Sequence, residues 1–443
     1  MSHRTVSLEQ LVALCKRRGF IYPTAEIYGG LNGVYDTGPL GTLMKQNIRA
    51  AWYEAVSKLP SYTVLPFEGS LLGPEAMWDA SGHTKNFHDP LVDCLSCKHR
   101  FRADDVNLQK PCPNCGQTAW TEIREFHLMF KTAVGAAASS HNYAYLRPET
   151  AQSIFVNFKH IMTSNRVKLP FGVAQTGKAF RNEITPKQFL FRMREFEQME
   201  LEWFCAPESS SDFFNFWINE RKSFYIKLGI DASRIRIRAH EQDELSHYSR
   251  GTSDVEYLFP FGWKELEGIA HRGDFDLLQH SRCSGKDLGI YDETTKTTMY
   301  PHVVECSVGV DRLLLTLLFE AYCEETIEDE VRTVLKLHPH IAPIKAAFFP
   351  LVKEQNEPME KIYHTIRKLL GIPIQFDASG SIGKRYRRQD EIGTPLCFTY
   401  DFESTHDQCV TVRERDSMIQ KRIPITEISA HIQALFKDSS NNH

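Results

Sequence analysis

Apolar residues near the start of the chain recur at helical spacing and then lead into a longer helix and a strand. Between Ser7 and Arg18 they return every three or four positions, which predicts a short amphipathic helix. The same spacing predicts a second helix from about Gly41 to Lys58. A short strand is expected directly after it, from Tyr62 to Pro66.

Runs of β-branched and aromatic residues dominate the middle of the chain, at 143–204 and again at 255–322. Such runs are typical of strands, and we interpret them as one mostly antiparallel sheet. The segment between them, 209–251, carries mixed helical signals and is interpreted as an excursion from that sheet. With the helices on either side, the predicted fold class is α+β.

A second domain is predicted after a proline-containing linker. Pro339, Pro343 and Pro350 follow the polar segment 323–331. From there the pattern predicts a strand, a helix (359–370), two strands and a final helix (428–437). We therefore predict a main domain at 1–340 and an α/β domain at 341–443, and a chain of 443 residues can bury both cores.

One predicted strand, from about Phe189 to Phe204, separates polar from apolar side chains, because residues of like parity share a face. The odd-numbered face is apolar and is predicted to meet the core: Met199, Leu201 and Trp203. The even-numbered face is polar or aromatic: Arg192, Arg194, Phe196, Gln198, Glu200 and Glu202. Arginines pair with phosphates, a ring stacks on a base and carboxylates hold Mg²⁺ or an amine, so this face is a candidate ATP site.

The same pattern is also typical of an exposed sheet face with salt bridges, and the strand alone leaves both interpretations open. A second nucleotide-like string, from Gly172 to Lys178, almost spells a phosphate-binding loop. However, Ala179 stands where Ser or Thr would bind Mg²⁺, and a strand is expected to follow. We therefore set this string aside.

Four of the 11 cysteines form a compact cluster within an insertion at about 93–117. Two Cys-x-x-Cys pairs with this separation are typical of a structural zinc site, because four thiolates fill a tetrahedron and leave no open position. The predicted ligands are Cys94, Cys97, Cys112 and Cys115. The alternative is a knuckle that keeps its cysteines reduced without metal.

The overall charge restricts how the protein could bind nucleic acid. The net charge of −4 argues against a generally basic nucleic-acid coat, so any such contact must be local. The basic run from Gly383 to Arg388 is the candidate, although a charge run is often only a solvated face. The start, Met1 to Gln10, lacks an apolar targeting segment, and no membrane helix is expected, which predicts a cytoplasmic protein.

Three segments in order resemble the signature motifs of class II aminoacyl-tRNA synthetases. The segment at about 172–204 contains Phe180-Arg181-Asn182-Glu183, a loop, and then Arg192 and Phe196, as in motif 2. The segment at about 302–320 turns from a strand into a helix that begins near Arg312, as in motif 3. The helix and strand at about 34–66 resemble motif 1, which in that class packs across the dimer axis.

Within the class the sequence resembles the dimeric glycyl-tRNA synthetases of class IIa from about Leu8 to the final helix. The strings that carry the resemblance are Arg17-Arg18-Gly19-Phe20, Glu26-Ile27-Tyr28-Gly29-Gly30, Tyr35-Asp36-Thr37-Gly38-Pro39-Leu40-Gly41, Ser81-Gly82-His83, Arg147-Pro148-Glu149-Thr150-Ala151-Gln152 and Arg194 to Glu200. The resemblance implies a class II antiparallel sheet with flanking helices, an anticodon-binding C-terminal domain, and a homodimer that acts on ATP, glycine and tRNA(Gly).

The resemblance also implies roles for the ATP-site residues. Arg181 would bind the α-phosphate, Arg192 and Arg312 the terminal phosphates, Phe196 would stack on adenine and Glu183 would bind its amino group. Glu265 or Glu305 would hold Mg²⁺. The expected ATP-site residues are Arg181, Asn182, Glu183, Phe191, Arg192, Met193, Arg194, Glu195, Phe196, Glu265, Leu266, Gly309, Val310, Asp311 and Arg312, with Arg181, Arg192 and Arg312 as the catalytic residues.

For the amino acid, the resemblance implies that Glu149, Glu305 and Ser307 surround the ammonium and Cα of glycine, and that Arg272 contacts the carboxylate. Excluding larger substrates requires side chains that fill the space beyond Cα. The full expected set is Arg100, Glu149, Phe196, Glu197, Gln198, Met199, Glu200, Arg272, Glu305, Ser307 and Gly309. The implied reaction is attack of the glycine carboxylate on the α-phosphorus, followed by transfer of glycine to tRNA with release of AMP and pyrophosphate.

Two positions depart from the family pattern, since Cys306 replaces a usual proline and Asp311 a usual glutamate. Three alternatives stay open. The chain could be a class IIa synthetase for another small amino acid, or a non-catalytic paralogue that serves as a tRNA-binding or polymerase accessory subunit. A zinc-dependent nucleic-acid-binding protein would explain the cysteines but not the ATP face.

Overall fold

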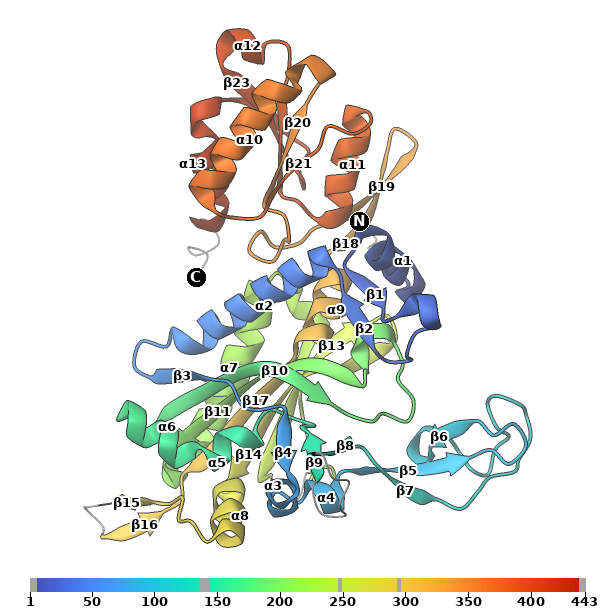
Figure 1. Ribbon diagram of the computed structural model, residues 1–443, viewed down its shortest axis with the longest axis vertical. Coiled ribbons are helices and arrows are strands. Elements are labelled where there is room, and N and C mark those ends of the chain that lie inside the picture. The colour runs from blue at the N-terminus through green and yellow to red at the C-terminus, as the bar shows by residue number, and fades with distance from the viewer. Residues whose placement is uncertain (1–5, 136–142, 246–248, 293–295, 438–443) are drawn as a thin grey trace.

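A seven-stranded sheet forms the centre of the larger part of the molecule (Figure 1), in a computed structural model that describes residues 6–135, 143–245, 249–292 and 296–437. The strand order is β12-β13-β14-β17-β11-β10-β3, and only the β3–β10 pair is parallel. The strands are β3 (Thr63–Phe67), β10 (Phe171–Phe180), β11 (Glu195–Cys205), β12 (Ile235–Ala239), β13 (Gly251–Phe259), β14 (Gly262–Gly273) and β17 (His302–Gly309). The predicted antiparallel sheet and the α+β class are confirmed.

Strand β11 has two chemically different faces, as its parity predicts. Met199, Leu201 and Trp203 are buried in the main hydrophobic core. The opposite face carries the polar even-numbered residues. Three helices cover the apolar side: α2 (Pro39–Ser57), α7 (Ser210–Lys227) and α9 (Val310–Ala321).

The first helices follow ordinary capping rules. Helix α1 (Leu8–Arg18) begins at a capping box of Ser7 and Gln10 and ends at Gly19, whose φ of 77° suits glycine. Helix α2 starts two residues before its predicted beginning, because Pro39 is suited to the first turn. The nearby strand pair is β1 (Ile21–Pro23) and β2 (Tyr35–Thr37), and a short helix, η1 (Glu26–Tyr28), lies between them.

The string that resembles a phosphate-binding loop lies inside strand β10. A Cβ atom at Gly177 would lie 2.1 Å from the Nη2 atom of Arg147. The Nε atom of Arg147 donates to the Lys178 carbonyl at 2.7 Å. Glycine is therefore required there for the close approach of a buried arginine, which is a structural reason unrelated to phosphate.

The segment 209–251 is only in part an excursion. It contains α7, but it then returns as β12, the edge strand that pairs with β13. The polar segment after α9 is also ordered, as a hairpin of β18 (Tyr322–Ile327) and β19 (Glu330–Leu335). Both strands are short and polar on one side, so their composition resembles that of loops.

A second, five-stranded sheet lies in the C-terminal part, in the order β21-β20-β22-β23-β24. Helices α10 and α13 pack on one face, and α11 packs on the other. The elements are β20 (Ala346–Pro350), α10 (Asn356–Leu370), β21 (Ile374–Phe376), α11 (Ile382–Ile392), β22 (Leu396–Tyr400), α12 (Ser404–Asp407), β23 (Cys409–Glu414), β24 (Gln420–Pro424) and α13 (Ile428–Lys437).

The basic run from Gly383 to Arg388 lies in helix α11, which the sequence pattern did not predict. Arg385 is buried and donates to the carbonyls of Ala378 and Gly380. Arg388 binds Asp377 at 2.6 Å. Half of the four cations in the run are therefore used inside the domain, which weakens the run as a nucleic-acid surface.

Buried ion pairs join the β18–β19 hairpin to the C-terminal sheet. Arg332 is fully buried and donates to Asp390 at 2.8 Å. Asp390 also accepts two hydrogen bonds from Arg413. Removing one partner of such a pair would leave a charge unpaired in a low-dielectric environment, so the pairs fix how α11 sits on the hairpin.

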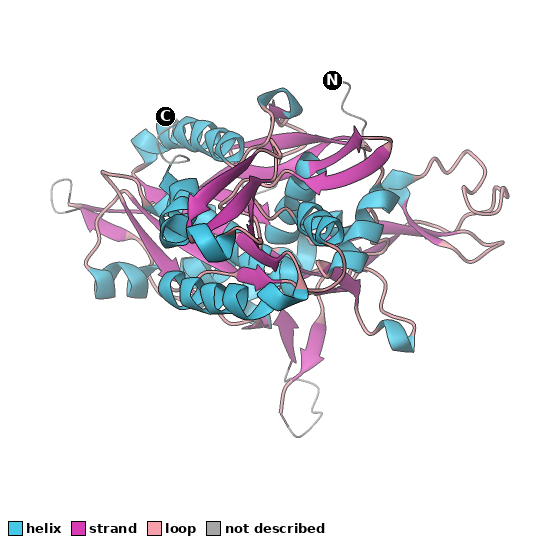
Figure 2. Cartoon of the chain, turned by 90° about the horizontal axis from the view of Figure 1, so that it is seen from above, coloured by secondary structure: helices cyan, strands magenta, loops and turns pink. Residues whose placement is uncertain are grey.

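The cysteine insertion extends away from the body in both views (Figures 1 and 2). Its sheet consists of β5 (His88–Asp93), β6 (Arg100–Arg102) and β7 (Arg124–His127). Among the described helices, none is long and apolar enough to cross a bilayer.

The remaining elements lie around the edges of the main sheet. They are β4 (Leu72–Pro74), α3 (Glu75–Ala80), α4 (His83–Asn86), β8 (Lys131–Ala133), β9 (Tyr143–Leu146), α5 (Gln152–Val156), α6 (Phe158–Asn165), α8 (Phe275–Ser284), β15 (Ile290–Asp292) and β16 (Thr297–Met299).

Candidate active site

A cavity of about 410 Å³ opens on the polar face of β11. Helices α5 and α6 cover the far end of the same face, so the cavity occupies the part of the sheet left uncovered. Its lining residues are Glu149, Arg181, Glu183, Leu190, Phe191, Arg192, Met193, Phe196, Gln198, Glu200, His240, Thr252, Asp254, Glu265, Gly268, Ala270, Glu305, Ser307, Gly309, Asp311 and Arg312.

One end of the cavity holds three arginines, and two of them lie beside aromatic rings. The guanidinium carbon of Arg181 lies 5.3 Å from the ring centroid of Phe196, and its Nε atom donates to the Pro148 carbonyl at 3.0 Å. Arg312 lies 4.6 Å from the ring of Phe191. Rings and backbone therefore hold these cations in place with their remaining N–H groups available to an anion.

Carboxylates neighbour the other two arginines. Arg192 lies 3.8 Å from Glu183, and Arg312 forms an ion pair with Glu265 at 3.0 Å. Burial raises the pKa of Glu183, and the charge of Arg192 offsets part of the rise. These carboxylates keep the cationic end partly neutralised.

Three residues near Arg181 and Arg192 in the sequence lie outside the cavity and make contacts within the protein. Arg194 donates to the Glu183 carbonyl, and Glu195 pairs with Lys178 at 2.8 Å. The backbone N–H of Asn182 donates to the Leu128 carbonyl. None of Asn182, Arg194 and Glu195 lines the cavity as described.

A buried lysine ties the three motif segments together. The Nζ atom of Lys45 on α2 lies 2.9 Å from both Glu197 and Asp311. Asp311 also accepts a hydrogen bond from the backbone N–H of Glu197 at 2.9 Å. Glu197, expected at the substrate, is therefore a link between β11, α2 and α9.

Three further expected contacts belong to the hydrophobic core. Met199, Leu266 and Val310 are at most 1% exposed and pack in the main core cluster. Their neighbours in sequence line the cavity because strand and helix geometry alternates the direction of side chains.

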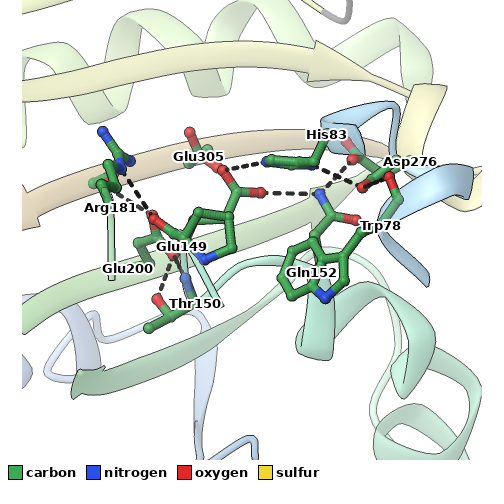
Figure 3. A network of polar contacts seen from close by, with 12 residues as sticks. Trp78, His83, Glu149, Thr150, Gln152, Arg181, Glu200, Asp276 and Glu305 are labelled. Atoms are coloured by element: carbon green, nitrogen blue, oxygen red, sulfur yellow. Dashed lines mark hydrogen bonds and ion pairs between the residues drawn. The ribbon is translucent and has the colours of Figure 1, made fainter. Parts of the chain in front are cut away.

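The other end of the cavity is rich in buried carboxylates (Figure 3). Glu149 accepts a hydrogen bond from Gln152 at 3.0 Å and lies 3.2 Å from His83. Burial alone would raise the pKa of Glu149, but His83 and Arg272 hold it well below its usual range. Glu149 is therefore an ionised carboxylate at neutral pH.

Glu200 is held by a ring of small polar groups. It accepts hydrogen bonds from the backbone N–H and the hydroxyl of Thr150, and from Ser307 at 2.7 Å. The amide of Gln198 donates to it at 3.1 Å. Burial and the charge of Glu149 raise the pKa of Glu200. These side chains fill the floor of this end of the cavity.

Arg272 is placed differently from its expected contact with a substrate carboxylate. It is 1% exposed, and its guanidinium donates twice to Asp276 and once to Glu305, each at 2.8 Å. It does not line the described cavity. Arg272 lies beneath the floor and orients Glu305, because its donors point at carboxylates of the protein.

Glu305 has an unusual protonation equilibrium. Burial raises its pKa to about 7, and the charges of Glu200 and Glu149 act in the same direction against Arg272. It also faces the cavity. A carboxyl that titrates near neutral pH within a substrate cavity is typical of a functional site.

Arg100, which was expected to contact the substrate, does not line the cavity. It is exposed on β6 of the insertion and binds Asp93 at 3.0 Å. The insertion residue that influences the arginine end of the cavity is Arg102, which binds buried Asp89 at 3.1 Å and offsets part of the burial effect on the pKa of Glu183. The sequence gives no signal that separates these two arginines.

Several residues of the site were not anticipated. Asp276, His83 and Gln152 hold the carboxylate end, and only their positions in the fold bring them there. Thr252 and Asp254 line the cavity from β13 and share a parity. Strand parity in 251–259 could have identified these two, but it offers nothing for the helical residues.

The four predicted metal ligands converge. The sulfur atoms of Cys94, Cys97, Cys112 and Cys115 all lie within 4.8 Å of one another. Sulfur atoms in a tetrahedral zinc site are separated by about 3.8 Å, since each Zn–S bond is about 2.3 Å. The cluster therefore fits a four-thiolate site.

Two parts of the chain match known families. Residues 131–322 match the family described as the tRNA synthetase class II core domain (G, H, P, S and T). Residues 341–435 match the family described as the anticodon binding domain.

The fold also resembles a solved synthetase. A prolyl-tRNA synthetase from Cryptosporidium parvum, solved with halofuginone and AMPPNP, superimposes with a TM-score of 0.68. The match covers 100% of this chain and 78% of that one, at 14% identity. At this identity the likeness supports the fold alone, and it is the class II fold with an anticodon-binding domain.

Similar proteins match over nearly their whole length. A glycine–tRNA ligase from Caldanaerobacter subterraneus subsp. tengcongensis is 48% identical over 98% of this chain and 99% of its own. One from Lysinibacillus sphaericus is 49% identical over 96% and 98% of the two chains, and one from Clostridium perfringens is 47% identical over 96% and 98%. The chain belongs to the glycine–tRNA ligases, a family of class II aminoacyl-tRNA synthetases.

Proposed function

We propose that this enzyme activates glycine with ATP and transfers it to tRNA(Gly). The observation that carries the proposal is the distribution of charge in one cavity, which has arginines at one end and buried carboxylates at the other. ATP needs cations around its phosphates, and glycine needs anions around its ammonium. The non-catalytic alternative is not favoured, because Arg181, Arg192 and Arg312 all face the cavity.

At the ATP end, Arg181 binds the α-phosphate while Arg192 and Arg312 bind the terminal phosphates. Phe196 stacks on adenine, and Glu183 accepts a hydrogen bond from its amino group. The rings and carbonyls that hold Arg181 and Arg312 support these roles, because preorganised cations need not reorganise as charge moves.

Glycine lies at the carboxylate end, with its ammonium toward Glu149 and Glu305 and its Cα toward Ser307. Ser307 and Thr150 are hydrogen-bonded to Glu200, and these three residues occupy the space that a larger substrate side chain would need. Larger amino acids are excluded because they would have to break these buried hydrogen bonds.

The enzyme accelerates the reaction by positioning its substrates rather than by supplying a general base. The glycine carboxylate attacks the α-phosphorus in line, and pyrophosphate leaves between the arginines. The resulting glycyl-adenylate then donates glycine to the terminal ribose of tRNA, which releases AMP.

Mg²⁺ would neutralise phosphate charge near Glu265. This residue is half exposed, and its charge contributes to the raised pKa of neighbouring Asp254, after burial. The oxygen atoms of two adjacent carboxylates, Glu265 and Asp254, are the kind of ligand that a hard cation prefers. Glu305 is a poorer Mg²⁺ ligand, because Arg272 binds one of its oxygens at the glycine end.

The four-cysteine cluster holds a structural zinc ion, which would stabilise the insertion at 93–117. The convergent sulfurs support this assignment, because four thiolates complete a tetrahedral shell. All cysteines of the described chain are free thiols, which suits a cytoplasmic enzyme.

The chain divides into its two domains near residue 340.

A second copy of the chain would cover an apolar groove of about 770 Å³ beside the motif 1 region, and we propose a homodimer. The groove is lined by Leu8, Glu9, Val12, Ala13, Lys16, Arg17, Ile21, Pro23, Tyr35 and Phe189. Close by in sequence, Ile27 and Tyr28 are 88% and 86% exposed. Such a patch is expected at an isologous interface, where each copy supplies both groove and protruding side chains.

Replacing Arg181 with alanine should lower glycine-dependent pyrophosphate exchange by roughly a hundredfold or more, because a charge that stabilises the transferring phosphate is lost. The Arg367→Ala variant, changed on an exposed helix of the C-terminal domain, is the control. Exchange should occur with glycine and with none of the other amino acids. Near-normal exchange by Arg181→Ala would refute the assigned role.

The KM for glycine should fall as pH rises from about 6 to about 8, by up to about tenfold. The pKa of Glu305 is raised to about 7, so the carboxyl is mostly protonated at the lower pH and becomes an anion for the ammonium as pH increases. Steady-state exchange at saturating ATP measures this profile, with the KM for ATP as the internal control. A glycine KM independent of pH would contradict the proposed contact.

Purified protein that has not met a chelator should contain one zinc per chain by elemental analysis. Cys97→Ser should lose most of it, because three thiolates leave the shell incomplete. Cys283→Ser is the matched control, since Cys283 is exposed and outside the cluster. Equal metal content in the two variants would rule out the site.

Sedimentation velocity at micromolar concentration should detect a dimer. Ile27→Asp should shift it toward monomer, because a charge would be buried in the interface. Leu369→Asp is the control, since Leu369 is also exposed, at 65%, but lies on α10. A wild-type monomer under these conditions would overturn the proposal.

A further inference from the structure

Glu202 is a buried acid for which the proposed reaction has no use. It lies on the same face of β11 as Glu200, and it is 0% exposed. Neither of its carboxyl oxygens has a hydrogen-bond partner among the described residues. Such surroundings strongly disfavour an ionised carboxylate, whereas a neutral carboxyl is far less costly to bury.

The strand register places Glu202 directly opposite Glu305, since the two residues are partners in the antiparallel pairing of β11 with β17. Side chains opposite each other on one face lie about 5 Å apart, and like charges there repel. Both residues are buried. The two carboxyls therefore cannot both be ionised without a large penalty.

The charged groups around Glu202 come from four elements. They are Glu200 on its own strand, Arg272 on β14, Asp276 on α8 and Glu305 on β17. Arg272 is the one cation in this set, and it donates two hydrogen bonds to Asp276 and one to Glu305. Three of the four neighbours are thus carboxyl groups, and the neighbourhood favours an uncharged Glu202.

The two members of the pair differ in what stabilises a negative charge. Glu305 accepts a hydrogen bond from Arg272 at 2.8 Å and reaches the cavity, where a cationic substrate group can approach. Within the part of the chain that the structure describes, Glu202 has no hydrogen-bond partner, and it does not line the cavity. Burial and the charge of Glu305 also raise the pKa of Glu202 well above its usual range.

We propose that Glu202 stays a protonated, uncharged acid throughout the reaction, so that Glu305 opposite it is the carboxyl that carries the negative charge for the ammonium of glycine. Glu202 is thus a positioning residue, which acts through Glu305. The proposal rests on the role proposed above for Glu305, and the experiment below tests the two separately.

Two isosteric variants distinguish the two placements of the proton. Glu202→Gln replaces a neutral acid by a neutral amide, so the KM for glycine in pyrophosphate exchange should stay within about twofold of wild type. Glu305→Gln removes the charged partner and should raise that KM about tenfold or more. If the proton were on Glu305 instead, Glu202→Gln would carry the large loss, and the proposal would be wrong.

Infrared difference spectroscopy on the full-length enzyme observes the proton itself. Wild-type protein should show the C=O stretch of a protonated carboxyl, with the expected shift in D₂O, both with and without glycine. The band should be missing from Glu202→Gln and retained in Glu305→Gln above about pH 8, where Glu305 is ionised in wild type. A spectrum unchanged by Glu202→Gln would overturn the proposal, and a merely structural Glu202 would give no such band.

Thermal unfolding of each variant checks that it is folded. If Glu202→Gln does not fold, a pH titration of the wild-type band tests the proposal instead. A band from Glu202 must persist after Glu305 has lost its proton. A band that disappears together with the proton of Glu305 would refute the proposal. If Glu305→Gln leaves the glycine KM unchanged while the Glu202 band is present, the proposed ammonium contact fails and the proton assignment stands.

Discussion

The pairing of Arg272 with Asp276 and Glu305 is the interaction on which the carboxylate end of the cavity depends. Five carboxyl groups, Glu149, Glu200, Glu202, Asp276 and Glu305, gather there with little access to water. Without a fixed cation, their mutual repulsion and loss of hydration would oppose folding. Arg272 offsets part of that cost from beneath the floor, and it leaves the upper surface negative toward the substrate.

A single buried cation also pairs with two carboxylates where the motif segments meet. Lys45 on α2 binds both Glu197 and Asp311, so one buried cation connects α2 to β11 and α9. The replacement of the usual glutamate by Asp311 is accommodated, because the shorter side chain still reaches Lys45 and the Glu197 N–H. A shift of α2 would therefore change the positions of Glu197 and Asp311 through a direct contact.

The two outlying parts are attached by electrostatics of different strength. The C-terminal domain is joined through the buried ion pair of Arg332 with Asp390. The cysteine insertion touches the ATP region through Lys187 and Asp105, which are about 40% exposed and screened by water and salt. A second pair, Arg102 with buried Asp89, lies inside the insertion and joins β6 to β5.

The sequence by itself determined the features that repeat at fixed spacing. The two faces of β11, the helices at α1 and α2 and the convergence of four cysteines follow from local periodicity and spacing, and each has the predicted form. Motif order also predicted arginines and an aromatic ring that the structure brings to one cavity, and their roles toward ATP stay predictions. Polar elements such as β18 and α11 were missed, since tertiary contacts rather than apolar periodicity stabilise them.

Only the tertiary structure decided how the charged side chains are used. Arg272 was expected to meet the substrate, yet its neighbours Asp276 and Glu305 occupy its donors. His83, Gln152 and Asp276 reach the glycine end from separate elements. The direction of a charged side chain depends on which opposite charges the fold brings within about 4 Å, and a linear pattern does not contain that distance.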